Sequence, residues 1–214
     1  MDIRELQKTA NEMRKDIIDM IYTAQSGHPG GSLSAADIFA VLYFKEMNVD
    51  PKNPDWEDRD RLVLSKGHAS PVLYAALAEK GFFPKDKLKT FRKINTKLQG
   101  HPNMNDTPGV DMTTGSLGQG LSAACGMALA GRLDKKGYRA YAVLGDGECE
   151  EGQIWEAAMS AAQYKLDNLT AILDHNGLQI DGRNDEVMNI EPIEDKWKAF
   201  GWYTIRIDGH DMQQ

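Results

Sequence analysis

The alternation of apolar strands and helices after residue 60 is the feature that most limits the fold of this chain. Short apolar runs typical of buried strands occur at "RLVLS" (61–65), "YRAYAVL" (138–144) and "LTAILD" (169–174), and "WYTIRID" (202–208) has the pattern of a further strand. Helical segments separate these runs, among them "EGQIWEAAMSAAQYK" (151–165). Strand–helix–strand units of this length specify a parallel sheet with helices on both faces. We therefore expect an α/β fold built on a mostly parallel sheet.

Residues 1–60 predict a helical arm in front of this α/β core. Apolar residues recur at three- and four-residue spacing near the start of the chain, and Gly27 is expected to end that helix. A second helix is expected at "SLSAADIFAVLYFKEM", where Ser34 and Asp37 fit a capping box. The core would then comprise residues 61–214. The chain stops at "GHDMQQ", where another helix should begin, so we expect this end to be incomplete.

The segment between the first two strands combines helices with a long irregular section. "ASPVLYAALAEKG" predicts a helix closed by Gly81, and residues 82–120 are expected to be rich in loops. The small-residue stretch "LSAACGMALAGRL" then predicts a helix that packs closely against its neighbours.

Composition and charge exclude several classes of protein. No apolar run approaches the length of a membrane span, and the start has no apolar core of a signal peptide. Cys125 and Cys149 stand 149 − 125 = 24 residues apart, which predicts free thiols of a cytoplasmic protein rather than a disulfide or zinc framework. The net charge of 25 − 32 = −7 argues against nucleic acid or an anionic membrane as a partner.

Two polar residues follow neighbouring strands and predict a metal–phosphate site. Asp146 comes directly after strand 138–144, and Asn176 after strand 169–174, 176 − 146 = 30 residues further on. One crossover helix accounts for that spacing, so both side chains can reach the same edge of the sheet. Carboxylate and amide oxygens suit Mg²⁺ or Ca²⁺, which can in turn bind a diphosphate. Either motif alone, "GDG" or "HNG", is more typical of a simple turn.

Histidines in three loops predict proton transfer. His28, His68 and His101 each follow a glycine in a segment expected to be a loop. A single loop histidine is more often only solvated, but three in one domain are less easily dismissed, because histidines carry protons near neutral pH. The acids Glu148 and Glu150 are interpreted as ordinary helix N-terminal residues that interact with the helix dipole.

Two other classes of function are weighed against this hypothesis. A nicotinamide dehydrogenase requires a strand followed by G-x-G-x-x-G, whereas "GSLGQG" (115–120) has its glycines in another order and no clear strand before it. A non-catalytic binding module would be favoured if the histidines or the metal ligands were missing, and they are present.

The stretch "GDGECEEGQIWEAAMSAAQYKLDNLTAILDHNG" resembles the thiamine diphosphate signature in its transketolase version, and the resemblance extends from "SGHPGG" to "IDGHD". The whole chain, 1–214, is similar to the diphosphate-binding domain of transketolases, most of all to the N-terminal subunit of the two-chain form. The resemblance implies that Asp146, Asn176 and the backbone carbonyl of Leu178 bind Mg²⁺, which Ca²⁺ can replace. It also implies that the N–H of Gly147 meets the diphosphate of the cofactor.

The resemblance assigns the remaining site residues as well. It places His28 and His101 against the donor sugar or its intermediate, and His68 at the diphosphate. Gly115 and Leu117 correspond to the pocket for the aminopyrimidine and thiazolium rings. Three further positions are noted: Ser116 replaces the usual proline, His175 replaces an acid, and Glu151 matches a position at the subunit interface.

The function implied by the resemblance is transfer of a two-carbon ketol unit from a ketose phosphate to an aldose phosphate, in the pentose phosphate pathway. The implied partner is a C-terminal pyrimidine-binding subunit, with two chains of each kind, and the chain alone is expected to be inactive. The related 1-deoxyxylulose-5-phosphate synthases stay open as an alternative. The three Gly-His loops and "NLTAILDHN" fit transketolase better.

Overall fold

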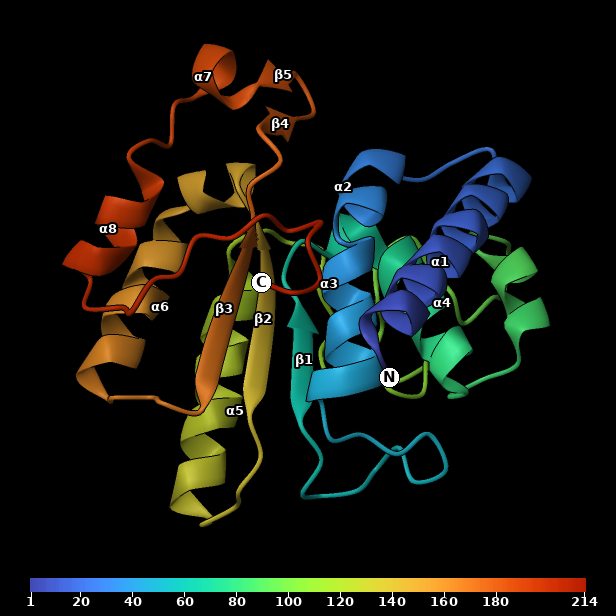
Figure 1. Cartoon of the computed structure of the whole chain (residues 1–214), viewed down its shortest axis with the longest axis horizontal. Helices are drawn as coiled ribbons and strands as arrows, with labels where there is room; N and C mark the ends of the chain where they lie inside the picture. The colour runs from blue at the N-terminus through green and yellow to red at the C-terminus, as the bar shows by residue number, and fades with distance from the viewer.

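The central sheet consists of three parallel strands in the computed structural model, which describes all residues 1–214. These are β1 (Arg61–Leu64), β2 (Ala140–Gly145) and β3 (Leu169–Asp174), in the order β1-β2-β3 (Figure 1). In the register of β2 and β3, Gly145 stands opposite Asp174. The residues that follow these two strands therefore leave the sheet at the same level, as the sequence predicts.

Helices, a small antiparallel hairpin and irregular segments make up the rest of the chain, and the longest irregular segment comprises residues 91–118. None of the helices combines the length and the apolarity needed to cross a bilayer. In chain order the elements are α1 (Ile3–Ala24), α2 (Pro29–Ser34), α3 (Ala36–Val41), the π-helix η1 (Leu42–Glu46), the 3-10 helix η2 (Gly67–Ala69), α4 (Ser70–Lys80), the 3-10 helix η3 (Lys85–Thr90), α5 (Gln119–Leu133), the 3-10 helix η4 (Gly147–Glu150), α6 (Gly152–Gln163), β4 (Leu178–Gln179), β5 (Gly182–Arg183), α7 (Asn184–Val187) and α8 (Ile193–Ala199).

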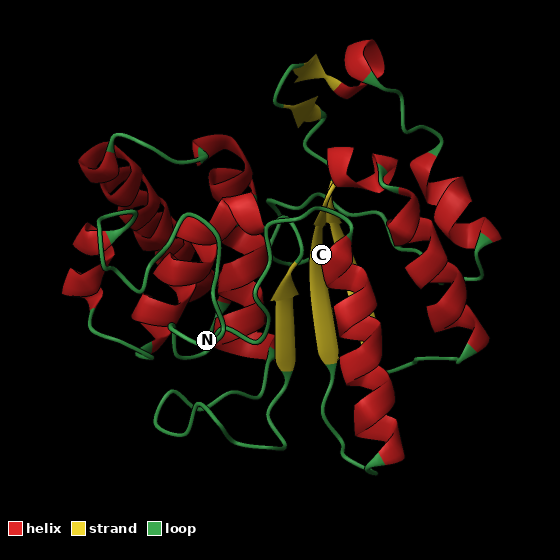
Figure 2. Cartoon of the chain, turned by 180° about the vertical axis from the view of Figure 1, so that it is seen from behind, coloured by secondary structure: helices red, strands yellow, loops and turns green.

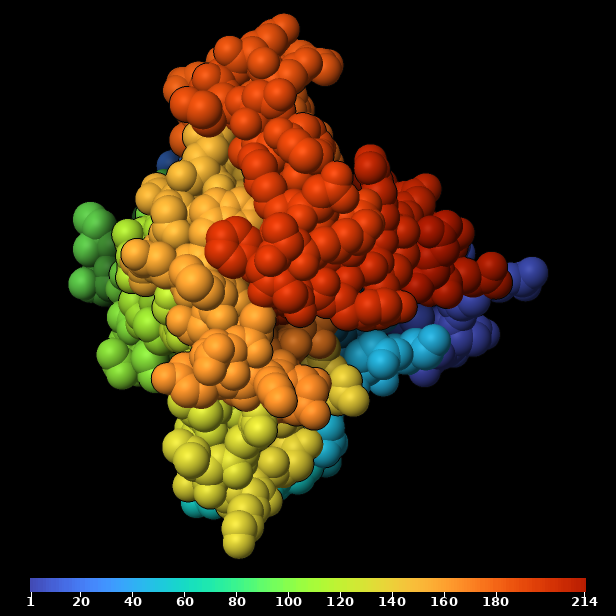
Figure 3. Space-filling model, turned by 90° about the vertical axis from the view of Figure 1, so that its left-hand side faces the viewer, coloured from blue at the N-terminus to red at the C-terminus, as the bar shows by residue number.

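Helices cover both faces of the sheet, because successive strand side chains point to opposite sides. On one face Leu62 and Val143 join a hydrophobic cluster with residues of α1, α3 and α4. On the other face Val63 and Ala142 pack with residues of α5, α6 and α8. Figure 2 shows these helix groups on either side of the strands, and Figure 3 shows α6, α8 and the chain after α8 covering one side of the molecule. The predicted α/β class with a leading helical segment is confirmed.

Helices α1 and α4 begin and end for local reasons. Asp2 and Glu5 form a capping box at the start of α1, and its predicted apolar stripe is buried. The helix stops at Ala24, three residues before Gly27, with Gln25 in the left-handed conformation. Helix α4 ends at Lys80, and Gly81 caps it at φ +99°, as the sequence predicts.

The predicted capping box of Ser34 and Asp37 is wrong. The helix begins earlier, at Pro29, so that Ser34 is the last residue of α2 and α3 follows after Ala35. The Ser34 hydroxyl donates to Asp174 Oδ1 over 2.8 Å, and the Asp37 carboxylate pairs with Arg14. Both side chains interact with residues far away in the chain, so neither is free to form a local cap.

The predicted strand at 202–208 is also absent. Residues 203–207 make no backbone hydrogen bond, and Tyr203, Ile205 and Ile207 are exposed. The segment passes from the end of α8 across the sheet toward α3, where His210 Nδ1 lies 2.7 Å from Asp37 Oδ2 (Figure 1). Its alternating pattern suits a strand, but a strand forms only where a partner edge pairs with it.

Candidate functional site

Asp146 joins the carboxyl ends of two strands. It follows β2 directly and is 3% exposed. Its Oδ2 accepts a 2.7 Å hydrogen bond from the N–H of Gly177, which lies beyond β3, and its Oδ1 accepts from the N–H of Gly147 at 2.9 Å. The N–H that the resemblance assigns to the diphosphate is therefore donated to Asp146 in this structure. The predicted meeting of the two strand ends is present.

Asn176 and Leu178 lie in the same turn as Gly177. The Asn176 Oδ1 accepts from the N–H of Leu178 at 2.9 Å, and Leu178 opens the β4–β5 hairpin that rises above the sheet (Figure 1). Gln179 packs closely on Gly147, where an added Cβ would lie 3.2 Å from that of Gln179. The Asp146 carboxylate is thus bonded to the turn that carries the Asn176 amide oxygen and the Leu178 carbonyl, and the carboxylate and amide oxygens accept backbone N–H groups in this structure. Such hard oxygen donors fit a divalent cation of the Mg²⁺ type.

The three predicted histidines come together through tightly packed glycine loops. The rings of His28 and His68 are 5.2 Å apart, edge to face. Gly67 leaves no room for a side chain, since an added Cβ would lie 2.6 Å from the N of Gly115. Gly115, at φ +149°, lies in turn against the ring of His101. These contacts connect the loop after β1, the start of α2 and the loop before α5 in one cluster.

Two of the histidines are held in the neutral form. Burial lowers the pKa of His28, and the nearby charges of Arg92 and His101 lower it further. Burial, together with His28 and Lys66, lowers the pKa of His68 to about 4. A neutral imidazole can both accept and donate a hydrogen bond. The buried Nδ1 of His28 has no partner within the protein, as expected at a site that receives a polar ligand.

Glu148 is a buried anchor, and its interpretation as an ordinary helix N-terminal acid is wrong. It is 2% exposed, and Oε1 accepts from the hydroxyl of Ser65 at 2.5 Å and from the N–H of Gly118 at 2.9 Å. Its Oε2 accepts from the N–H of Gly145 at 3.0 Å. Burial raises the pKa of this carboxyl group, and the three hydrogen bonds oppose the rise. By contrast, Glu150 is exposed and accepts only from the side chain of Gln179.

Lys66 is a second buried residue that sequence reasoning did not identify. It directly follows β1, is 1% exposed, and donates from Nζ to Asp174 at 2.5 Å and to the carbonyl of Gly31 at 3.1 Å. Since Asp174 also accepts from Ser34, the pair connects β1 and β3 to α2. The only sign of this buried ion pair in the sequence is the position of Lys66, between a predicted buried strand and His68.

The other residues singled out in the sequence lie around this edge. Leu117 is half-buried in the turn before α5, beside the exposed Ser116. Glu151 occupies the N-cap position of α6 without a capping hydrogen bond from its side chain, and it packs against Gly118, where an added Cβ would lie 2.9 Å from that of Glu151. His175 points to Glu191, with Nε2 3.3 Å from its carboxylate oxygen.

Comparison with known proteins agrees with this arrangement. The chain matches the family described as "Transketolase, thiamine diphosphate binding domain" over residues 5–214. It is 53% identical over 210 residues to the 6-deoxy-6-sulfo-D-fructose transketolase subunit SqwG of Clostridium sp. (strain MSTE9), covering 98% of this chain and 76% of that protein. It is 44% identical to one of the subunits of the apulose-4-phosphate transketolase of Phocaeicola vulgatus, covering 100% of this chain and 75% of the relative.

Single-chain transketolases are similar over about a third of their length. The transketolase of Mus musculus is 48% identical over 219 residues, which cover 99% of this chain and 34% of the mouse protein. The crystal structure of transketolase from Campylobacter jejuni superimposes with a TM-score of 0.94 at 39% identity, covering 100% of this chain and 34% of that one. The chain therefore belongs to the transketolase family, whose thiamine diphosphate-binding domain it represents.

Proposed function

We propose that this chain is the cofactor-binding subunit of a two-chain transketolase that moves a two-carbon ketol unit from a ketose phosphate to an aldose phosphate. The observation that supports this most is the convergence of three histidine loops on the sheet edge where Asp146 meets the turn after β3. Two relatives of which the chain covers about three quarters are themselves named as transketolase subunits.

The cofactor would be held through a metal ion. Asp146, the side chain of Asn176 and the carbonyl of Leu178 would bind Mg²⁺, and His68 would contact the diphosphate. Gly115 and Leu117 would line the space for the cofactor rings. Bound thiamine diphosphate supplies the carbon–carbon bond cleavage and formation, and the protein orients it.

The proposed roles of the histidines rest on their charge state and position. The lowered pKa of His28 favours its neutral form, so its unpartnered Nδ1 would accept a proton from a sugar hydroxyl, and the imidazolium formed in this way would return it. His101, on the neighbouring loop against Gly115, would act on the same donor sugar. Because these loops pack closely, the rings of His28 and His101 have little freedom to move, and the distance between them is fixed.

The proposed partner is a subunit with a pyrimidine-binding domain, in an assembly of two chains of each kind. In the transketolase resemblance that domain supplies the glutamate that activates the aminopyrimidine ring. The single chain would therefore be inactive and hold the cofactor weakly.

The test is reconstitution of the purified chain with a candidate partner, thiamine diphosphate and Mg²⁺. We expect ketol transfer from a ketose phosphate to an aldose phosphate by the mixture, and none by either protein alone. An Asp146→Ala chain mixed with the same partner serves as the control for the cofactor site. Sustained transfer by this chain alone would contradict the two-chain proposal. Condensation of pyruvate with glyceraldehyde 3-phosphate, in place of ketol transfer, would favour a 1-deoxyxylulose-5-phosphate synthase.

A further inference from the structure

Three polar side chains connect the turn after β2 with the hairpin after β3, and they have no role in the function described so far. The Nε2 of Gln179, in β4, donates to Glu150 Oε1 over 2.7 Å and to Asn184 Oδ1 over 3.2 Å. Glu150 is the last residue of η4, and Asn184 is the first residue of α7. We call these three side chains the hairpin bridge. The bridge joins the segment that follows Asp146 to the segment that follows Asn176.

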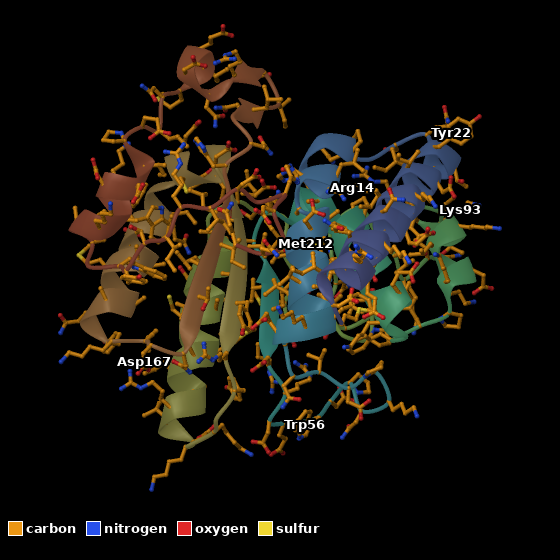
Figure 4. The ribbon with its side chains drawn as sticks, in the orientation of Figure 1. Arg14, Tyr22, Trp56, Lys93, Asp167 and Met212 are labelled. Carbon is orange, nitrogen blue, oxygen red and sulfur yellow. The ribbon has the colours of Figure 1, made fainter.

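Hydrophobic packing does little to hold the hairpin against the sheet edge. Its two strands form only two residue pairs, and a two-stranded hairpin of this kind is marginally stable by itself. Figure 4 shows the hairpin and α7 as a projection above the sheet. The apolar side chains on this projection are exposed, namely Leu178, Ile180, Val187 and Met188. The position of the hairpin therefore depends on its polar contacts.

Asn184 is the buried end of the hairpin bridge. It is 5% exposed, whereas residues 185–189 are all exposed. Its Nδ2 has no partner within the protein, and a buried donor without an acceptor costs stability. An apolar side chain would avoid that cost, so packing alone does not account for an amide at this position. The acceptor Oδ1 accounts for it, because this atom holds Gln179.

The contacts of the bridge residues fix the turn at 176–178, which carries two of the proposed metal ligands. The backbone N–H of Asn184 donates to the carbonyl of Gly177 over 3.1 Å, and the N–H of Gly177 donates to Asp146 Oδ2. Gly177 is thus held on one side by Asp146 and on the other by Asn184. Gln179 packs on Gly147, the first residue of η4, where an added Cβ would lie 3.2 Å from that of Gln179.

We infer from these contacts that Gln179 and Asn184 are positioning residues. They hold the turn at 176–178 at a set distance from Asp146 before a metal ion binds. Mg²⁺ requires nearly octahedral geometry and short bonds to oxygen, so a small shift of this turn would weaken metal binding. The inference rests on the proposed function, because the assignment of the metal ligands belongs to it. Neither Gln179 nor Asn184 is itself a ligand.

The first experiment measures amide hydrogen exchange by NMR in the full chain without metal or cofactor. Gln179→Met removes both side-chain hydrogen bonds of the bridge and keeps the length of the side chain, and Asn184→Ala removes the acceptor Oδ1. Both variants should increase the exchange rate of the Gly177 amide at least about tenfold, because the turn opens more often. The amides of β2 should exchange as in wild type, which shows that the fold is intact. Unchanged exchange of the Gly177 amide in both variants would overturn the inference.

Arg183→Met is the matched control for Gln179→Met. Arg183 lies in the same hairpin and is exposed, and its side chain hydrogen-bonds only to Asp185. This variant should leave the exchange rate of the Gly177 amide unchanged. An increase as large as in Gln179→Met would show that any loss of a polar contact loosens the hairpin, which would also overturn the inference.

The second experiment measures thiamine diphosphate binding to the assembled enzyme by calorimetry, at limiting and at saturating Mg²⁺. Gln179→Met and Asn184→Ala should weaken binding at least about tenfold at limiting Mg²⁺, because residues that orient metal ligands affect metal affinity on this scale. At saturating Mg²⁺ the loss should be much smaller. An equal loss at both Mg²⁺ concentrations would indicate a merely structural role and overturn the inference. Absence of binding to the wild-type protein would instead contradict the proposed function, while the exchange rates would still decide whether the bridge holds the turn.

Discussion

Removal of the Glu148 carboxylate should destabilise the fold far more than removal of its exposed neighbour Glu150. Glu148→Ala leaves two backbone donors without an acceptor, the buried N–H of Gly118 and the half-buried N–H of Gly145. Each unsatisfied donor costs about 1–3 kcal/mol, which gives about 2–6 kcal/mol for the pair. Burial already disfavours the ionised carboxylate and offsets part of this loss. We therefore expect a decrease of about 2–3 kcal/mol in the free energy of unfolding.

Urea denaturation followed by circular dichroism at pH 7 measures this decrease. With a slope of about 2–3 kcal/mol/M, the midpoint of Glu148→Ala should fall by about 1 M. Glu148→Gln should lose about half as much, because its carbonyl keeps the bonds from Ser65 and Gly118 while its NH₂ group opposes the N–H of Gly145. Glu150→Ala should stay within about 0.5 kcal/mol of wild type. If Glu148→Ala and Glu150→Ala unfold at the same urea concentration, the anchoring role of Glu148 is wrong.

Other predictions concern the cofactor site and its histidines. Asp146→Ala should weaken thiamine diphosphate binding in the assembled enzyme at least about tenfold, as measured by calorimetry with Mg²⁺. Asn176→Ala should weaken it less, because this variant removes a neutral ligand. Unchanged affinity would exclude the assignment of these residues to the metal. His101→Ala should lower kcat while cofactor affinity stays nearly constant. His68→Ala should instead weaken cofactor binding. If each variant shows the effect expected of the other, the two roles are reversed. The pKa of His68 is lowered from 6.5 to about 4 in the folded chain. Between these pH values the unfolded chain binds a proton at this residue and the folded chain does not. The free energy of unfolding should therefore fall as the pH drops from 6.5 toward 4. Urea denaturation at pH 7 and pH 5 should show a smaller fall for His68→Asn than for wild type, and an identical fall would contradict the neutral state of His68.

Much of the framework could be predicted from the sequence, because local pattern determines it. The strand at 169–174 is predicted with its observed bounds, and the end of α4 is predicted because Gly81 favours the left-handed cap. The position of Asp146 and Asn176 at one edge follows from the rule that parallel strands present their carboxyl ends together. The first two inferences use information within a few residues of each position, and the third needs only the order of two strands and the one crossover helix between them.

The errors and omissions involve contacts between residues far apart in the chain. Lys66 pairs with Asp174 across 108 positions, Ser65 binds Glu148 across 83, and Ser34 reaches Asp174 across 140. Neither hydrophobic periodicity nor a capping motif identifies contact partners that lie so far apart in the sequence. The same reason explains the segment 202–208, whose alternating residues predict a strand but find no edge with which to pair.

The packing of charges at this sheet edge also explains why the proposal includes a metal ion. Lys66 is the one cation buried there, and its charge is already matched by Asp174. Two acids remain close by, Asp146 and Glu148, and both accept from backbone N–H groups that would otherwise be free to receive a phosphate. A diphosphate would meet net negative charge at this edge and would be repelled. A divalent cation held by Asp146 would reverse that repulsion, so the proposed function predicts that cofactor binding depends on the metal.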